Sequence, residues 1–297
     1  MFEIAVILVT YNNASTLRKC LHSLSRVLTD FHSQLLLIDN KSTDTTPDIL
    51  NECIRRKQLS FDAVELILNA DNKGYTSAVN QGLEKSRGEY ILFLNPDIYF
   101  ADTPFPTLIK YLSENKQVGV IAPQLRHLNG AIQPSCRTFP RKRDVLYEVF
   151  GLSRVFKTSS VFNRWKMGSF DHKMSRDVHQ PQGAFLLTRK MVIQSVGVLD
   201  NRFPMFFSDV DWCYRVWRAG WTIRFCAGVF VYHGLGTSVR QKKSQMMISS
   251  HRSFVDYFEK YDSLPRDRLY TLGISALLLV ITPVRLFFSA IKTSGIS

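Results

Sequence analysis

Four short polar segments carry the side chains best suited to chemistry, and each directly follows an apolar run. They read Thr10-Tyr11-Asn12-Asn13, Asp39-Asn40-Lys41-Ser42-Thr43-Asp44, Asn69-Ala70-Asp71-Asn72-Lys73-Gly74 and Asn95-Pro96-Asp97. Taken singly, each has a structural explanation, because Asn, Asp, Ser and Gly make turns and cap helices. If the apolar runs are parallel strands of one sheet, the segments share its carboxyl edge, where α/β proteins bind ligands. The pattern therefore predicts a polar site along that edge.

The elements that would position these segments alternate between strand and helix. Phe2–Val9 is a continuous apolar run, typical of a strand buried on both faces. The leucines after it recur at helical spacing, with Ser15 or Asn13 as the cap. The alternation continues with predicted strands 34–38, 64–68 and 90–94 and predicted helices 47–56 and 75–86. Such βαβ units predict right-handed crossovers and a mostly parallel sheet.

The second half of the chain is less regular. Asn129-Gly130 predicts a hairpin. The basic stretch 137–177, with adjacent Arg141, Lys142 and Arg143, predicts a partly mobile insertion over the site. The other expected elements are helix 105–112, strand 118–122, strand 183–188, the segment 202–207, helix 210–219 and a strand ending at 229–232. The last of these strands delivers His233.

Composition limits the class of protein. Apolar residues at 45% and charged residues at 21% are ordinary for a soluble globular protein, so neither a disordered chain nor a polytopic membrane protein is expected. The five cysteines form no CxxC pair, which argues against a disulfide scaffold or a zinc site. The net charge of +13 favours nucleic acid, anionic lipid or phosphorylated small molecules as partners, with surplus surface lysine as the alternative. No basic segment precedes the first apolar run, so it is interpreted as the first strand of a cytosolic protein.

Seven motifs in order make the sequence resemble the family 2 glycosyltransferases of the GT-A fold. They are VTYNN, DNKSTD, NKGYTSAVNQG, LNPD, QGAFLLTRK, FFSDVDWCYR and VYHGLGTS. The sequence is similar to bacterial rhamnosyltransferases that build O-antigen and other cell-surface polysaccharides. The resemblance implies an α/β nucleotide-diphospho-sugar transferase fold over residues 1–240, with a nucleotide-binding half over 1–123 and an acceptor half over 124–240. Residues 241–297 are expected to form an apolar, helical, membrane-associating segment.

The resemblance places the nucleotide on the first four polar loops. Asp39, which ends the second strand, would accept a hydrogen bond from a uracil or thymine imide. Gly74 would let the backbone pass close beneath the ligand, because glycine has no side chain. The expected nucleotide-binding residues are Thr10, Tyr11, Asn13, Asp39, Asn72, Gly74 and Asn95.

Asn95-Pro96-Asp97 occupies the position of the family's Asp-x-Asp motif, whose last carboxylate binds a divalent ion that bridges the donor's phosphates. We expect Asp97 to bind Mg²⁺ or Mn²⁺ directly, because these hard ions take few protein carboxylates and fill their shells with phosphate oxygens and water. The ion would stabilise the departing diphosphate as a Lewis acid. Asn95 replaces the first aspartate, so it is expected at most to touch ribose or water. His233 matches a second metal ligand, and a histidine merely hydrogen-bonded at a strand end is the alternative.

Transfer with inversion needs a base that takes the proton of the acceptor hydroxyl. Asp209 matches the family's base, although Ser208 replaces the acidic residue often found before it. Asp209 also reads as the N-cap of helix 210–219, and both roles are compatible. Asp211 and Trp212 are the expected acceptor contacts, and Trp212 could equally belong to the core.

The C-terminal stretch 269–291 is rich in Leu, Ile, Val and Phe and has no charge before Arg285. A spanning helix needs about 20 apolar residues, and Pro283 and Arg285 interrupt the run before that length. We therefore expect a helix in the membrane surface, with a spanning helix and a packing helix or dimer interface as alternatives. The residues expected near anionic head groups are Arg266, Arg268, Arg285 and Lys292.

These expectations combine into one predicted activity. The chain would transfer a sugar, L-rhamnose from the nucleotide-sugar donor dTDP-rhamnose, to a polyprenyl-diphosphate-linked glycan at the cytoplasmic face of a bacterial inner membrane. A UDP-sugar donor is the main alternative, since fold does not fix chemistry. A nicotinamide dehydrogenase should show GxGxxG after the first strand, and a sugar-phosphate nucleotidyltransferase a Gly-rich phosphate loop; VTYNNAST has neither. No nucleic-acid-binding motif accompanies the charge, and a homo-oligomer is left open.

Overall fold

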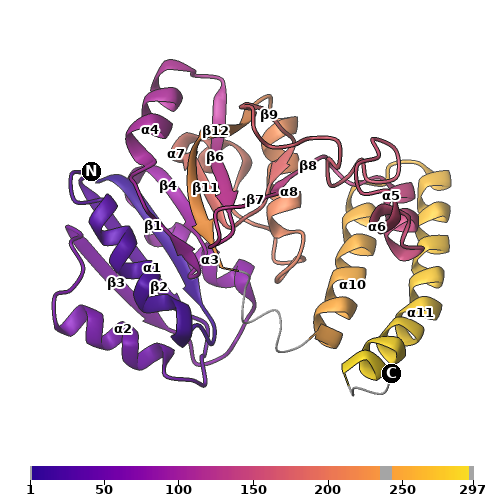
Figure 1. Ribbon diagram of the computed structural model, residues 1–297, viewed down its shortest axis with the longest axis horizontal. Coiled ribbons are helices and arrows are strands. Elements are labelled where there is room, and N and C mark those ends of the chain that lie inside the picture. Colours follow the sequence, from indigo (N-terminus) through magenta and orange to yellow (C-terminus); the bar gives the residue numbers. More distant parts are fainter. Residues whose placement is uncertain (1, 235–242, 294–297) are drawn as a thin grey trace.

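The structure, a computed structural model, describes residues 2–234 and 243–293, and its centre is a mixed β-sheet (Figure 1). The main strands are β1 (Phe2–Thr10), β2 (Ser33–Asp39), β3 (Ala63–Leu68), β4 (Gly88–Leu94), β5 (Ile98–Tyr99), β6 (Val118–Arg126), β11 (Phe185–Arg189) and β12 (Thr222–His233). Their order is β3-β2-β1-β4-β11-β6-β12-β5. Shorter strands are β7 (Ile132–Gln133) beside β6, β9 (Arg176–Asp177) beside β12, and a separate ribbon of β8 (Cys136–Arg137) and β10 (Gln180–Pro181).

Along this order of eight strands, four of the seven pairings are parallel. β1 pairs in parallel with β2 and β4, β2 pairs with β3, and β12 pairs with β6. β11 is antiparallel to both β4 and β6, so β6 and β12 keep the direction of the first four strands. The carboxyl ends of β1, β2, β3, β4 and β12 therefore share one edge, which is the arrangement that the polar segments predict.

Helices cover both faces of this sheet. One face carries α1 (Ala14–Val27), α2 (Thr46–Arg55) and α4 (Phe105–Glu114), and the other carries α3 (Tyr75–Lys85), α7 (Lys190–Val196) and α8 (Ser208–Arg218). The side chains of β1 alternate between the two cores, with Ile4, Val6 and Leu8 in the first and Ile7 and Val9 in the second. Because both sets are buried, the strand reads as a continuous apolar run.

A helical group stands beside the sheet, at the end of the molecule away from β3 (Figure 1). It consists of α5 (Lys142–Val149), α6 (Leu152–Val155), α10 (Lys243–Tyr261) and α11 (Pro265–Thr293). An apolar cluster joins α10 to the start of α8, with Phe254 and Tyr257 against Phe207. Ile274 and Leu278 of α11 are buried in the same cluster. Helices α10 and α11 thus pack on the rest of the chain through this cluster.

The regular elements expected from the sequence are confirmed, with ends shifted by one or two residues in the first half. The hairpin is also confirmed, since His127 N donates to Ala131 O at 2.8 Å and Gly130 has a φ of +84°. All five cysteines are buried and free. Over the described residues, no helix combines the length and apolarity needed to cross a bilayer.

Candidate active site

Asp97 and His233 meet at the carboxyl edge of the sheet. The chain leaves β4, turns at Asn95, and returns as β5, which pairs with the end of β12 so that Ile98 lies opposite His233. Gly234 N donates to Asp97 O at 2.8 Å. These backbone contacts hold His233 Nε2 at 3.3 Å from Asp97 Oδ1, and both side chains are buried.

The pair has the geometry of two adjacent metal ligands. Two ligands at about 2.1 Å from an octahedral Mg²⁺ lie about 3 Å apart, close to the 3.3 Å between Nε2 and Oδ1. His233 Nδ1 lies 3.1 Å from Gln133 Oε1, so an N–H on Nδ1 donates to the amide and the lone pair of Nε2 points at Asp97. Within the described ranges, no cluster of three or more His, Cys, Asp or Glu is found. An ion here would complete its shell with phosphate oxygens and water, as hard ions prefer.

Asp209 lies in the first turn of α8, against β10 and the segment before β11. Its Oδ2 accepts hydrogen bonds from Gln180 Nε2 at 2.8 Å and Gly183 N at 3.0 Å. A Cβ on Gly183 would lie 3.1 Å from that oxygen, so glycine permits the approach. Burial raises the pKa of Asp209, opposed in part by the amides of Gly183 and Val210 and the charge of Arg137. A carboxylate more basic than usual suits proton abstraction near neutral pH.

The N-cap interpretation of Asp209 is wrong. The helix begins at Ser208, and its N-cap is Phe207, which has a left-handed φ of 67°. Asp209 therefore sits one residue inside the helix, where its Oδ1 accepts only from Val210 N at 2.9 Å. The buried Phe207 ring packs on Phe254 of α10, which fixes the chain path before the helix.

Backbone contacts join the turn after β4 to the segment before β11 that binds Asp209. Asn95 N donates to Ala184 O at 2.9 Å, and Ala184 directly follows the glycine that binds Asp209. Burial raises the pKa of the phenol of Tyr75, the first residue of α3, and the charge of Asp209 raises it further, which is the effect of a nearby carboxylate. The turn after β4, the start of α8 and the start of α3 thus belong to one site.

Thr10 and Asp39 are joined at the ends of β1 and β2, where they lie opposite each other in the parallel register. Thr10 Oγ1 donates to Asp39 Oδ1 at 2.8 Å, and Ser42 adds bonds from its Oγ at 2.6 Å and its N at 2.8 Å. A carboxylate offers about four lone pairs, so one on Oδ2 remains for an imide N–H. Asn13 Oδ1 accepts from Tyr11 N at 2.8 Å and shapes the adjoining loop.

Asn72 and Gly74 connect the third loop to both halves of the chain. Asn72 Oδ1 accepts from Asn40 Nδ2 at 2.8 Å and from Gly74 N at 3.0 Å. Gly74 has a φ of +90°, and a Cβ there would lie 2.7 Å from Pro204 O. Glycine is thus required both by its backbone conformation and by its packing. In the structure, the backbone at Gly74 closely approaches Pro204, which lies in the second half of the chain.

Asp211, an expected acceptor contact, is buried in an ion-pair cluster. Its Oδ1 accepts from Lys260 Nζ at 2.5 Å and Tyr261 OH at 2.6 Å, and its Oδ2 lies 3.0 Å from Arg215 Nε. Because residues two apart on a helix are about 200° apart around the axis, Asp211 points away from the side of Asp209. It is 0% exposed and does not reach an acceptor in this arrangement.

Trp212, the other expected acceptor contact, belongs to the core. Its ring packs edge-on against Phe93 at 5.4 Å between centroids, and its Nε1 donates to Gly197 O at 3.2 Å. Trp212 therefore lies in the core, as the alternative interpretation of this residue expected. The local reason is that positions 212, 213 and 216 form the stripe of α8 that covers the sheet.

Several residues of the site escaped the sequence reasoning. Gln133 follows the predicted hairpin turn, and Gln180 precedes the QGAF motif, so their nearness to motifs was an available signal. Arg137 lies in the basic stretch, where nothing in the spacing distinguishes it from its neighbours. The segment 235–242, which holds the end of the VYHGLGTS motif, lies outside the described residues.

Comparison of the whole sequence with known proteins finds glycosyltransferases. The sequence model described as glycosyl transferase family 2 matches residues 5–178. The N-acetylglucosaminyl-diphospho-decaprenol L-rhamnosyltransferase of Mycobacterium tuberculosis is 27% identical over 263 residues, which cover 84% of this chain and 81% of that protein.

Solved structures confirm the predicted GT-A fold. The mannosyltransferase PcManGT from Pyrobaculum calidifontis, in complex with GDP-Man and Mn²⁺, matches with a TM-score of 0.57 at 16% identity, over 99% of this chain and 76% of that one. TarS 1–349 from S. aureus, in complex with UDP, matches with a TM-score of 0.52 at 16% identity, over 84% of this chain and 64% of that one. At these identities the likeness concerns the fold.

Proposed function

Because the chain belongs to glycosyl transferase family 2, we propose that it is an inverting, metal-dependent enzyme that transfers L-rhamnose from dTDP-rhamnose to a polyprenyl-diphosphate-linked glycan. The observation that carries this proposal is the placement of Asp97, His233 and Asp209 in one site at the carboxyl edge of the sheet. Two ligands for a divalent ion and one unusually basic carboxylate are the groups that such a transfer needs.

The proposed chemistry is a single displacement. Asp209 takes the proton of the acceptor hydroxyl while that oxygen attacks the anomeric carbon from the face opposite the diphosphate. The bond from the anomeric carbon to the phosphate oxygen breaks, and the configuration inverts. A divalent ion held by Asp97 and His233 would supply positive charge to the departing diphosphate. Gln180 and Gly183 hold the Asp209 carboxylate in place, which lowers the entropy lost in reaching the reactive geometry.

The donor assignment draws on the relatives. The Mycobacterium tuberculosis relative is named for rhamnosyl transfer to N-acetylglucosaminyl-diphospho-decaprenol, which supports rhamnose and a lipid diphosphate acceptor. A UDP-sugar is the second candidate, because TarS of the same fold binds UDP. Mn²⁺ in the PcManGT complex supports a divalent ion in this chain. The lone pair left on Asp39 Oδ2 suits the imide of thymine and of uracil equally.

We propose that the reaction takes place at a membrane surface, the cytoplasmic face of the inner membrane, and α11 supports the membrane contact. One side of this helix buries Thr271, Ile274 and Leu278. The opposite side, named here the outer face of α11, exposes Leu269, Tyr270, Leu272, Leu279 and Val280, each by more than 60%. These positions span about half of the helix circumference at 3.6 residues per turn. An apolar stripe of this width is unfavourable in water and suits the boundary between head groups and acyl chains.

Basic residues accompany this outer face. Arg266 and Arg268 are exposed at the start of α11, as expected for contact with anionic head groups. The side chains of Arg285 and Lys292, which were expected to act in the same way, lie outside the described residues. A membrane-bound α11 would keep the site next to an acceptor whose lipid is anchored in the bilayer.

A donor panel tests the proposal. The full-length chain is incubated with dTDP-L-rhamnose, UDP-glucose, UDP-N-acetylglucosamine or GDP-mannose and a short-chain N-acetylglucosaminyl diphospholipid, with Mn²⁺ or with EDTA. We expect transfer from dTDP-rhamnose only, an inverted anomeric configuration in the product by NMR, and no transfer in EDTA. Transfer from a UDP-sugar alone would establish the second candidate. Retained configuration or full activity in EDTA would contradict the proposed mechanism.

A further inference from the structure

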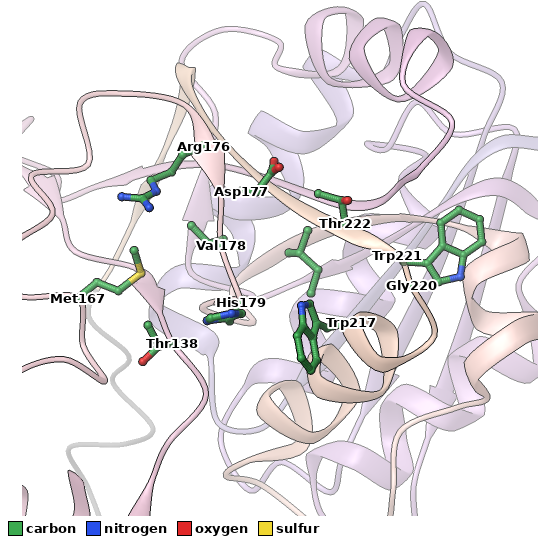
Figure 2. A pocket seen from close by; sticks show the side chains of 11 residues that line it. Thr138, Met167, Arg176, Asp177, Val178, His179, Trp217, Gly220, Trp221 and Thr222 are labelled. Carbon is green, nitrogen blue, oxygen red and sulfur yellow. The ribbon is translucent and has the colours of Figure 1, made fainter.

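A cavity at the end of α8 remote from Asp209 has no part in the proposed displacement. Its volume is about 520 Å³, and its walls come from the ends of the β8–β10 ribbon, β9, the last turn of α8 and the start of β12 (Figure 2). Small-molecule sites typically enclose about 300–1,000 Å³. The cavity is therefore large enough to hold a small molecule.

Aromatic rings form one side of this cavity. Figure 2 shows the Trp217 indole and the His179 imidazole standing beside the open space. Their centroids are 6.0 Å apart at an interplanar angle of 89°, and Trp217 is backed by a stacked Tyr214 at 6.1 Å. Trp217 is 49% exposed although it is held by its neighbours. A rigid, exposed indole offers apolar contact area that loses little side-chain entropy when a ligand binds.

The polar groups of the cavity suit a ligand that is rich in hydroxyls. Arg176 and Asp177 carry opposite charges at its rim, and Asp177 is already paired with Arg224 at 3.0 Å. Burial, with help from the charges of Arg164 and Arg141, lowers the pKa of His179. Its imidazole is then neutral and offers one donor and one acceptor. The guanidinium of Arg176 donates hydrogen bonds, and the neutral imidazole both donates and accepts, so a hydroxyl-rich ligand can pair with each of these groups.

We propose that this cavity is a saccharide-binding site that takes the part of the acceptor glycan remote from the reacting hydroxyl. A pyranose ring has an apolar C–H face, which matches the exposed indole of Trp217, and a rim of hydroxyls, which matches the hydrogen-bond donors and acceptors around it. The assignment of this saccharide to the acceptor rests on the proposed function.

The position of the cavity agrees with an extended acceptor. Trp217 follows Asp209 by eight residues on α8, which is about 12 Å along the axis at 1.5 Å per residue. His179 directly precedes Gln180, whose amide holds the Asp209 carboxylate. A glycan of a few sugars with its reacting end at Asp209 spans this length, whereas a single sugar does not.

Direct binding gives the first test, and it does not depend on catalysis. Saturation-transfer NMR is run on the full chain with methyl rhamnoside, chitobiose, chitotriose and maltotriose. We expect signals from at least one oligosaccharide, their loss in Trp217→Ala, and partial retention in Trp217→Phe, which keeps a ring. Phe156→Ala, at a residue with 47% exposure outside the cavity, is the matched control. Binding by no saccharide, or unchanged binding in Trp217→Ala, overturns the site.

Acceptor length gives the second test. With diphospholipid acceptors of one, two and three sugars, Trp217→Ala should lower kcat/KM by about three- to tenfold, the worth of one aromatic contact, only for the longer acceptors. Hydrolysis of the donor should be unchanged. An equal loss for all lengths would show that the variant disturbs the site at Asp209 and would overturn the acceptor assignment. If the wild-type chain turns over no donor, the proposed function fails while the NMR result still decides the saccharide site.

Discussion

Two aspartates two residues apart on α8 should respond to the same substitution in opposite ways. Asp209→Asn removes the base but keeps the shape, so turnover should fall on the order of 10²–10⁴-fold, which is the usual worth of general-base help. The introduced amide can still accept from Gln180 and Gly183 through its oxygen, while its NH₂ group faces Val210 N. One mismatched contact costs about 1 kcal/mol, so stability and donor affinity should change little.

Asp211→Asn removes a charge that nothing replaces. Lys260 keeps its ion pair with Asp200 at 2.7 Å, and Arg215 keeps its bonds to the carbonyls of Val196 and Val198. Breaking a buried pair typically costs about 3–5 kcal/mol, and the surviving partners place this case near the lower end. For a chain of this length, about 3 kcal/mol corresponds to a fall in Tm of about 5 °C. Turnover below the melting transition should stay close to wild type.

The assay compares both variants with the wild-type chain at one temperature well below all three melting points. Single-turnover transfer measures the chemical step, calorimetry with the nucleotide diphosphate measures donor-site affinity, and differential scanning calorimetry measures Tm. More than about a tenth of wild-type turnover in Asp209→Asn would remove it as the base. A turnover loss in Asp211→Asn as large as that in Asp209→Asn would refute the division between chemistry and structure on this helix.

Three further predictions follow from the same site and its surroundings. Asp97→Ala should weaken Mn²⁺-dependent donor binding more than His233→Ala does, because a carboxylate brings a full negative charge to the ion and a neutral imidazole only a lone pair. Equal losses of donor affinity in calorimetry would argue against direct coordination by the carboxylate. Burial raises the pKa of Asp209, the proposed base, and the charge of Arg137 lowers it. Arg137→Gln should therefore move the acidic limb of the kcat profile to higher pH. A limb that stays or moves to lower pH would contradict the assignment. Leu279→Glu on the outer face of α11 should abolish flotation with anionic vesicles without changing Tm. The control is Leu128→Glu, at a similarly exposed leucine of the β6–β7 hairpin, which should float like wild type. Flotation by both variants would exclude the outer face as the membrane contact.

The fold was predictable because its first half follows local rules. Runs such as Phe2–Val9 are apolar on both faces, and that pattern has few solutions other than a central parallel strand. The polar loops then had to share one edge, which brought Thr10 to Asp39 and the turn after β4 to the end of β12. Parallel pairing is enough to predict this edge, because it fixes which ends of the strands lie together.

Roles on α8 were harder to predict, because they depend on contacts that are distant in sequence. Asp209 and Asp211 look alike in the motif, and only the helix phase and the arrival of Lys260 and Tyr261 distinguish them. The N-cap error has the same origin, since Phe207 is held in its left-handed conformation by the packing of α10. Spacing within one motif therefore suggested site roles for both carboxylates, and it could not predict that Asp211 is buried in an ion-pair cluster.

The buried cluster at Asp211 also joins the C-terminal helices to α8. Lys260 and Tyr261 end α10, and both bind the carboxylate two residues after Asp209, the proposed base. Lys142 of α5 pairs in turn with Asp262 at 2.7 Å, where α10 gives way to α11. The position of α8 is thus tied to the helix pair whose outer face we assign to the membrane. If α11 lies in the bilayer surface, the same contacts that hold the helix pair also set the distance from Asp209 to that surface. An acceptor whose diphosphate is fixed at the head groups would then meet the base at a height determined by this cluster.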